Sequence, residues 1–258
     1  MIWSGSRRIG GPAPVAVLLA ALAASGTAVA ADDDTVTEFD RPGIGFGADV
    51  LKAGAMAWEQ GGPSITRDRQ DGAQSTLYTL DSLLRLGLGG HLELQLGADS
   101  YNWVRGDVRA RGGGDASAGL KLTLPSVDED FSWALLGRYT LPTGAPAFSQ
   151  GGYSRQLGVS ASWDLGAGRS LALYANYAQG DEGHTWTFSP SYTFYSDERF
   201  SGYVEAGYAH GVDPSRVAGG GMTWRVLRNV QLDISALRGL DSQSPDWQGG
   251  VGIAVAFR

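Results

Sequence analysis

The sequence predicts an all-β protein in which about twelve antiparallel strands form an up-and-down β-barrel that crosses a membrane. Three observations lead to this fold class. Apolar and polar residues alternate with a period of two in many segments, which is the pattern of strands with two different faces. Glycine occurs 39 times, beside 8 Trp, 10 Tyr and 8 Phe. After residue 30 there is no run of 18 apolar residues, so membrane-spanning helices are not expected.

The first thirty residues form a predicted secretory signal peptide, which does not belong to the fold. Arg7 and Arg8 precede an apolar stretch at 13–24, and the small residues Ala28 and Ala30 on either side of Val29 make a cleavage site. A stretch of this length is too short to cross a bilayer, which takes roughly 20 residues. We therefore expect export through the inner membrane and cleavage before Ala31.

The exported chain is acidic and contains no cysteine. Without Arg7 and Arg8, 18 basic residues remain against 27 acidic ones, for a net charge of −9. This charge disfavours nucleic acid as a partner. The absence of cysteine excludes disulfides, thiolate metal sites and cysteine nucleophiles. We expect residues 31–52 to form a periplasmic N-terminal segment and residues 53–258 to form the barrel domain.

The alternation defines the individual strands. In residues 184–195, Trp186 and Phe188 begin an apolar face, while Thr185 and Thr187 begin a polar face. Residues 230–236 and 251–257 show the same pattern. The predicted strands are 53–61, 74–87, 91–101, 113–124, 131–141, 153–164, 170–179, 184–195, 199–210, 217–226, 229–238 and 247–257.

The links between these strands alternate in length. Short links are expected around 89–90, 166–168, 197–198 and 227–228, and longer polar links at 62–73, 102–112, 142–152 and 239–246. The links at 125–130 and 180–183 depart from this alternation. Short turns at one end and longer loops at the other are typical of outer-membrane barrels, whose short turns face the periplasm. Both termini are therefore expected on the periplasmic side.

The bulk of the apolar face distinguishes a membrane barrel from a soluble one. In a soluble barrel the apolar side chains point inward and the outer face is charged. Here the apolar face carries bulky Trp, Tyr, Leu and Val, while the polar face holds mostly Ser, Thr, Gly, Ala and Gln. Aromatic residues near strand ends, such as Trp103 and Trp224, suit the girdles at membrane interfaces. A lipid-facing exterior and a wet lumen fit this distribution better than a soluble core.

The region after the signal peptide also resembles a known family. The stretch Phe39-Asp40-Arg41-Pro42-Gly43-Ile44-Gly45-Phe46-Gly47 is followed by the runs at 77–97 and 119–137. Together they are similar to a family of bacterial outer-membrane transporters labelled "MetA-pathway of phenol degradation". The resemblance extends from about Phe39 to the C-terminus, with Asp40, Arg41, Pro42 and Gly43 as the family motif. It implies an outer-membrane barrel that passes small hydrophobic or aromatic molecules.

The C-terminus resembles the strand signal that is read by the outer-membrane insertion machinery. Gly252, Val255 and Phe257 match this signal, with Phe257 penultimate and Arg258 after it. The resemblance implies that the barrel-insertion machinery of a Gram-negative bacterium and its outer-membrane lipid are partners of the chain.

The lumen is the expected working surface. When each strand's phase is taken from its apolar face, seven acidic and four basic side chains point inward: Glu59, Asp81, Arg85, Glu93, Asp99, Lys121, Arg138, Asp164, Glu205, Arg225 and Asp233. The favoured function is a porin-like conduit for passive passage of small solutes, with a weak preference for cations. The alternative is a barrel plugged by salt bridges, with a structural or surface-interaction role, because charges of both signs occur on adjacent strands.

A barrel enzyme that acts on lipid is a third alternative with less support. Such a hydrolase needs a serine beside a histidine that a third group orients. None of His91, His184 and His210 lies in the Ser-Asn-Gly context of outer-membrane phospholipases. We therefore expect no catalytic residue, no metal site and no cofactor.

Overall fold

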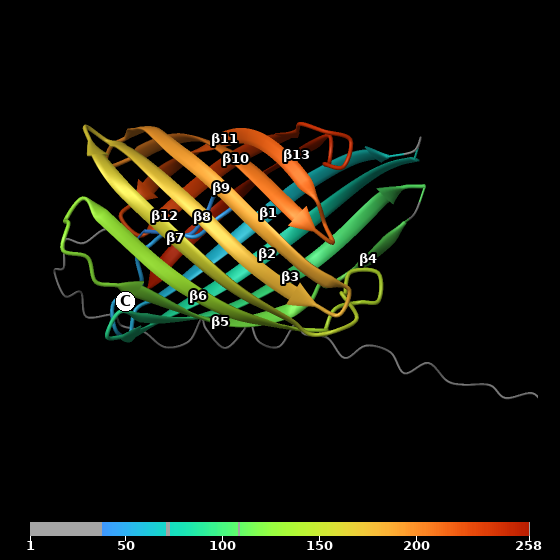
Figure 1. Cartoon of the computed structure of the whole chain (residues 1–258), viewed down its shortest axis with the longest axis horizontal. Helices are drawn as coiled ribbons and strands as arrows, with labels where there is room; N and C mark the ends of the chain where they lie inside the picture. Colours follow the sequence, from blue (N-terminus) through green and yellow to red (C-terminus); the bar gives the residue numbers. More distant parts are fainter. Residues whose placement is uncertain (1–37, 71–72, 108, 258) are drawn as a thin grey trace, which may run out of the picture. The chain divides into compact units, whose positions relative to one another are not determined.

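A computed structural model describes residues 38–70, 73–107 and 109–257, so the predicted signal peptide lies outside the described residues. Its strands form one antiparallel sheet that closes on itself, because β1 pairs with both β2 and β13 (Figure 1). The strands are β1 (Met56–Gln70), β2 (Ala73–Gly89), β3 (Leu92–Gly106), β4 (Ala110–Gly112), β5 (Ala116–Leu124), β6 (Phe131–Leu141), β7 (Ser154–Gly166), β8 (Arg169–Gly180), β9 (Gly183–Ser196), β10 (Phe200–Gly211), β11 (Ser215–Leu227), β12 (Val230–Gly239) and β13 (Trp247–Phe257).

The predicted fold class is confirmed. β4 has only three residues and pairs with the far end of β3, and the other twelve strands build the barrel wall. Each of these twelve overlaps a predicted strand, and β6 and β13 agree with 131–141 and 247–257 at both ends. The agreement is close because alternation between two solvents is a property of each strand by itself.

The predicted long link at 62–73 is wrong. β1 continues to Gln70 and β2 begins at Ala73, so the two strands form one extended hairpin. The Gly-Gly-Pro sequence at 61–63 is typical of the end of a strand. Here a register shift between Gln60 and Ser64 accommodates it within β1. β3 likewise continues to Gly106, inside the predicted link at 102–112.

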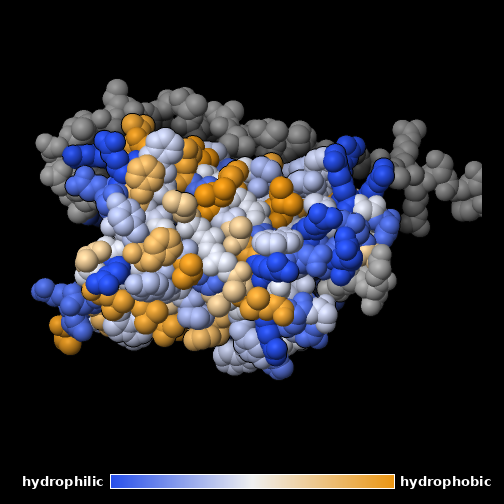
Figure 2. Space-filling model, turned by 90° about the horizontal axis from the view of Figure 1, so that it is seen from above, coloured by the Kyte–Doolittle hydropathy of each residue, from blue (hydrophilic) through white to orange (hydrophobic). Residues whose placement is uncertain are grey.

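The barrel has an apolar outside and a charged inside. Large apolar side chains are exposed on the outer face, among them Leu120, Leu157, Phe188, Met222 and Ile234. The largest fully buried side chains are Arg85, Lys121, Gln95, Glu59 and Glu93. Figure 2 shows hydrophobic side chains over the middle of one face and hydrophilic side chains gathered toward its ends. Among the described residues there is no helix long and apolar enough to cross a membrane.

The chain before β1 lies inside the barrel, and we call residues 38–55 the luminal segment. Phe39 and Leu51 pack together with Ala57 and two alanines of β13, next to the start of β1. Between them the chain extends into the lumen, where its N–H groups bond to carboxylates of the wall. This arrangement differs from the periplasmic location expected for residues 31–52, because from Glu38 onward the chain finds its hydrogen-bond partners inside the barrel.

Candidate functional site

Arg85 of β2 anchors the luminal segment to the wall. Its Nε and Nη2 donate to the two carboxylate oxygens of Glu93, at 2.7 and 2.9 Å, and its Nη1 donates to Glu59 at 2.9 Å. The remaining donors bond to the carbonyl oxygens of Glu38 and Asp49, at 3.0 and 3.4 Å. All five N–H groups of the guanidinium are therefore used. The side chain is fully buried, so these partners replace its entire hydration shell.

Asp40 places a carboxylate of the luminal segment among wall residues of β3 and β5. Its Oδ1 accepts from Lys121 Nζ at 2.8 Å and from the N–H of Gly47 at 3.0 Å, while Oδ2 accepts from Gln95 Nε2 at 2.8 Å. Arg85 Nη1 lies 3.7 Å from Oδ1. Asp40 thus satisfies Lys121, which is completely buried and would be costly without an acidic partner.

Wall carboxylates also bind the backbone of the luminal segment. These bonds run from the N–H of Asp40 and of Arg41 to Glu59, at 3.0 and 2.9 Å, from Ile44 to Glu205 at 3.0 Å and from Leu51 to Glu93 at 2.8 Å. Hydrogen bonds to charged acceptors are stronger than neutral ones. The segment is therefore fixed to β1, β3 and β10 along most of its length.

Arg41 reaches the opposite side of this network. Its guanidinium pairs with Asp81 of β2 and binds Asp233 of β12 at 3.3 Å through Nε and 3.2 Å through Nη2. Gln231 holds the Arg41 carbonyl at 3.0 Å. A Cβ at Gly252 would lie 2.5 Å from Arg41 Nε, so a larger residue at this position would displace the guanidinium from its place against β13. We call the inward charged side chains of β1, β2, β3, β5 and β12 the charged wall: Glu59, Asp81, Arg85, Glu93, Lys121 and Asp233.

The opposite wall is uncharged. We call the inward side chains of β7, β8 and β9 the polar wall: Gln156, Ser160, Tyr174, Asn176 and Ser189. Phe46 of the luminal segment meets it, edge-on against Tyr174 with ring centroids 5.6 Å apart. A Cβ at Gly158 would lie 2.9 Å from Phe46 Cε1 and 3.3 Å from the ring of Tyr174. Glycine here leaves the space that the Phe46 ring occupies.

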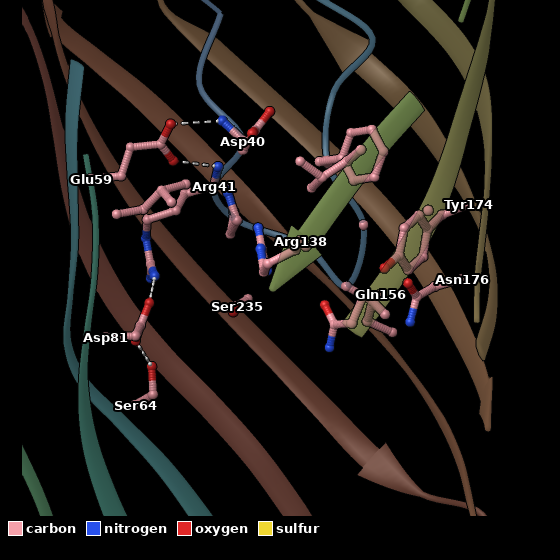
Figure 3. Close-up of a pocket in the computed structure, with 18 residues that line it drawn as sticks. Asp40, Arg41, Glu59, Ser64, Asp81, Arg138, Gln156, Tyr174, Asn176 and Ser235 are labelled. Carbon is pink, nitrogen blue, oxygen red and sulfur yellow. Dashed lines mark hydrogen bonds and ion pairs between the residues drawn. The ribbon is translucent and has the colours of Figure 1, made fainter. Parts of the chain in front are cut away.

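A cavity of about 390 Å³ lies between the luminal segment and the polar wall. Figure 3 shows Arg41 and Asp81 on one side of it, Tyr174 and Asn176 on the other, and Arg138 between them. The lining is mostly polar, with Phe46 and Tyr174 as its aromatic part. Such a space can hold a small solute in contact with amide, hydroxyl and guanidinium groups.

Arg138 of β6 is the cation of this cavity that lacks an acidic partner. It lies directly opposite Gln156 in the β6–β7 register, and its Nη2 donates to Gln95 Oε1 at 3.1 Å. In the part of the chain that the structure describes, Arg85, Lys121 and Arg41 all make ion pairs, but Arg138 makes none. Its guanidinium is the group in the cavity best placed to meet an anionic or polar solute.

The family is established by the sequence as a whole. Residues 39–257 match the family described as "Putative MetA-pathway of phenol degradation". The chain belongs to this family. Its predicted motif, Asp40 to Gly43, lies in the luminal segment, where Asp40 and Arg41 bind the charged wall. The sequence has no match among curated proteins.

Three solved structures show the same fold as this family member. An outer membrane channel from Pseudomonas putida F1 has a TM-score of 0.65 and 14% identity, over 84% of this chain and 99% of that one. KdgM porin has a TM-score of 0.55 and 9% identity, over 79% and 99%. NanC porin has a TM-score of 0.52 and 10% identity, over 79% and 99%. At these identities the likeness concerns the fold, which is that of an outer-membrane barrel.

The structure brings most of the predicted lumen-lining residues together, but not all. Glu59, Asp81, Arg85, Glu93, Lys121 and Asp233 join the network around the luminal segment, and Glu205 binds its backbone. Arg225 lies 3.6 Å from Glu38 at the segment's start. Asp99 lies opposite Asp81 in the β2–β3 register, and its side chain lies beside Gly114.

Asp164, although predicted to line the lumen, does not take part in the network around the luminal segment. The residue is exposed, and its carboxylate accepts the N–H of Gly166 at 2.8 Å at the last positions of β7. Inward phase alone does not place a residue in the network, because the last positions of a strand extend beyond the wall.

The predicted insertion residues lie on the last strand, at the closure of the barrel. Phe257 pairs with Met56 and is half exposed on the outer face, and Val255 pairs with Trp58 of β1. Gly252 lies opposite Gly61 and has the additional role of making room for Arg41.

Sequence reasoning missed the neutral residues of the site and the contacts of the luminal segment. The prediction considered inward charges alone, so Gln95, Gln156, Tyr174 and Asn176 were left out although they share the inward phase. A signal for the segment was present in the excess of inward acids over bases, because Arg41 supplies a cation that the wall lacks. No local sequence pattern predicts that Asp40 lies beside Lys121.

Proposed function

We propose that this protein is a porin-like transporter of the Gram-negative outer membrane that lets small solutes cross passively. The observation that supports it most is the cavity between the luminal segment and the polar wall, which uncharged side chains line on the side of the polar wall and which Arg138 also lines. Uncharged hydroxyl and amide groups bind solutes too weakly to retain them, which is what passage requires. The charges of the opposite wall are largely occupied by the luminal segment.

We further propose that small aromatic compounds are among the solutes. The family description refers to phenol degradation, and Phe46 and Tyr174 offer an aromatic edge to the cavity. An aromatic ring prefers offset or edge-on contacts of the kind that these two side chains already make. Arg138 stands beside them and suits solutes that carry a hydroxyl or carboxylate group.

Refolded protein in liposomes and planar bilayers tests the proposal. We expect swelling in a series of sugars, amino acids and aromatic acids, with the smaller members entering faster, together with a measurable ion conductance. Absence of both swelling and conductance would contradict passive passage. Two unit charges 4 Å apart in water interact by about 1 kcal/mol, so Arg138→Gln should lower the anion-to-cation permeability ratio several-fold while the barrel remains folded.

A plugged barrel with a structural or surface-interaction role is the second candidate. The observation in its favour is the luminal segment itself, which is bound to several strands through buried charges. The two candidates differ in one measurement. A plugged barrel conducts only after the segment is released, whereas a transporter conducts with the segment bound.

We also propose that the chain is exported with a cleaved signal peptide and inserted by the barrel-insertion machinery into outer-membrane lipid. The exposed aromatic side chain of Phe257 on the last strand supports this interpretation.

A further inference from the structure

A row of arginines crosses the outer face of the barrel at the end where β1 turns into β2. Arg238 of β12 lies opposite Trp247 of β13, which lies opposite Arg67 of β1. Arg67 in turn lies opposite Thr76 of β2, which lies opposite Arg105 of β3. Directly opposed residues point to the same face of a sheet. The three arginines are exposed, so the row points to the outside.

Aromatic side chains lie beside two of these guanidinium groups, those of Arg105 and Arg238. Arg105 lies over the ring of Trp103 with its Cζ 3.7 Å from the centroid, and Arg238 lies over Trp247 at 5.2 Å. A guanidinium stacked on an aromatic face keeps its N–H groups directed sideways, where they can donate to another partner. Aromatic rings at this height are typical of the membrane interface, so the arginines lie at the level of lipid headgroups.

The row carries an excess of positive charge. A hollow of about 290 Å³ is lined by Arg67, Arg69 and Arg238, with Asp241, Asp246, Gly239 and Trp247. Asp241 lies 3.6 Å from Arg216 and also accepts from Ser244. Over the described parts of the chain, no ion pair involves Arg67, Arg105 or Arg238. Figure 2 shows a group of hydrophilic side chains on the right, at the end at which β4 lies in Figure 1.

The opposite end of the outer face differs. Its terminal outward positions hold large apolar side chains such as Trp163, Phe200 and Phe257. The arginines of this end lie in or beside the short turns between strands, and they are Arg169, Arg199 and Arg228. In the expected orientation the end of the barrel at which β1 ends and β2 begins faces the cell exterior. The arginine row therefore lies in the outer leaflet, and the apolar end lies in the inner one.

We propose that Arg67, Arg105 and Arg238 form a binding site for the phosphate groups of an outer-leaflet glycolipid. Guanidinium groups bind phosphate oxygens through paired N–H donors. Neighbouring strands lie about 4.8 Å apart, so arginines two strands apart are separated by roughly 10 Å, which suits a headgroup carrying more than one phosphate. This site lies on the outside of the wall and does not depend on whether the lumen conducts.

Titration of the folded protein in detergent with bisphosphorylated lipid A, followed by native mass spectrometry, tests this site. A basic residue at a membrane surface contributes about 1 kcal/mol, or about fivefold in affinity. The triple variant Arg67→Gln, Arg105→Gln, Arg238→Gln should therefore bind lipid A on the order of a hundredfold more weakly. The matched control, Arg169→Gln, Arg199→Gln, Arg228→Gln, removes the same charge at the opposite end and should bind like the wild type.

Two further arms separate a lipid site from a site for any anion. Dephosphorylated lipid A should bind the wild type as weakly as bisphosphorylated lipid A binds the triple variant, and inorganic phosphate in excess should not displace the lipid. Equal binding of both lipids, or equal losses in the two triple variants, would overturn the proposal. Displacement by inorganic phosphate would show a simple anion site. Heat-modifiable mobility of every variant confirms that each barrel is folded.

Discussion

The charged wall and the polar wall face one another across the same lumen, yet they contact the luminal segment through different kinds of interaction. The charged wall binds it through buried ion pairs, with Arg85 and Lys121 fully enclosed. The polar wall touches it mainly through the ring of Phe46 and leaves a cavity beside it. In the sequence, both walls are the polar faces of strands with alternating apolar and polar residues.

The two sides of one lumen therefore differ: buried charges lie on the side of the charged wall, and the cavity lies on the side of the polar wall. A buried charge must be paired, and here the luminal segment and the charged wall supply each other's ionic partners. Hydroxyl and amide side chains can remain hydrated and impose no such requirement. The segment is therefore held on one side, and the free space lies on the other.

The largest effect is expected from Arg85→Met, which removes the guanidinium that binds the luminal segment to the charged wall. Removing one member of a buried ion network costs roughly 3–5 kcal/mol, because Glu59 and Glu93 are left without their cation. We expect the luminal segment to detach while the wall keeps its backbone hydrogen bonds. Hydrogen exchange at the N–H groups of Asp40 and Leu51 should accelerate, and conductance should rise.

Arg155→Met is the control for this change, because Arg155 is exposed on the outer face. It should leave exchange and conductance as in the wild type. Unchanged exchange in Arg85→Met would show that the charged wall does not hold the segment.

Gly158→Leu tests the polar wall. Its new side chain would meet Phe46 and Tyr174 at less than normal contact distance, so we expect overpacking of roughly 1–3 kcal/mol and a narrower cavity. Liposome swelling should slow for the larger solutes first. Gly137→Leu is matched to it, since a Cβ at exposed Gly137 meets nothing within 4 Å. Equal swelling rates in the two variants would place the passage elsewhere.

The smallest expected effect concerns the rim where the two walls join. Asp115, just before β5, accepts the N–H of Gly144 at 2.8 Å and of Gln150 at 2.9 Å in the loop between β6 and β7. Partial burial acts to raise the pKa of this carboxyl, but the N–H donors outweigh it and hold the pKa below its usual value of 3.8.

Because the folded pKa is lowered, Asp115 stabilises the loop above pH 3.8 and loses this contribution as the pH falls through the folded value. Asp115→Asn should abolish the dependence, at a cost of at most about 1 kcal/mol for a mostly solvated group. Proteolysis within residues 142–153 as a function of pH measures it. A wild-type loop that is equally protected at neutral and strongly acidic pH would contradict the role of Asp115.

The sequence predicted the wall well and the site only in part. Alternation located every strand of the barrel, and it placed Glu59, Arg85 and Lys121 on the inward face. It failed at residues 62–73, where Gly and Pro suggested a break that a bulge absorbs. It did not anticipate that Asp40 and Arg41 meet these wall residues.

Local pattern by itself determined where the strands of the wall lie, apart from the extension of β1 beyond residue 61 and of β3 beyond residue 101. It also determined which face of each strand meets lipid, because a period of two is set within a few residues. Only the tertiary structure decided which charges become partners. Arg41 and Asp233 are separated by 192 positions in the chain and meet because the closed barrel brings β12 near β1 and the luminal segment turns inward between them. Such a pairing depends on the closure and on the path of the segment, and both are properties of the whole fold.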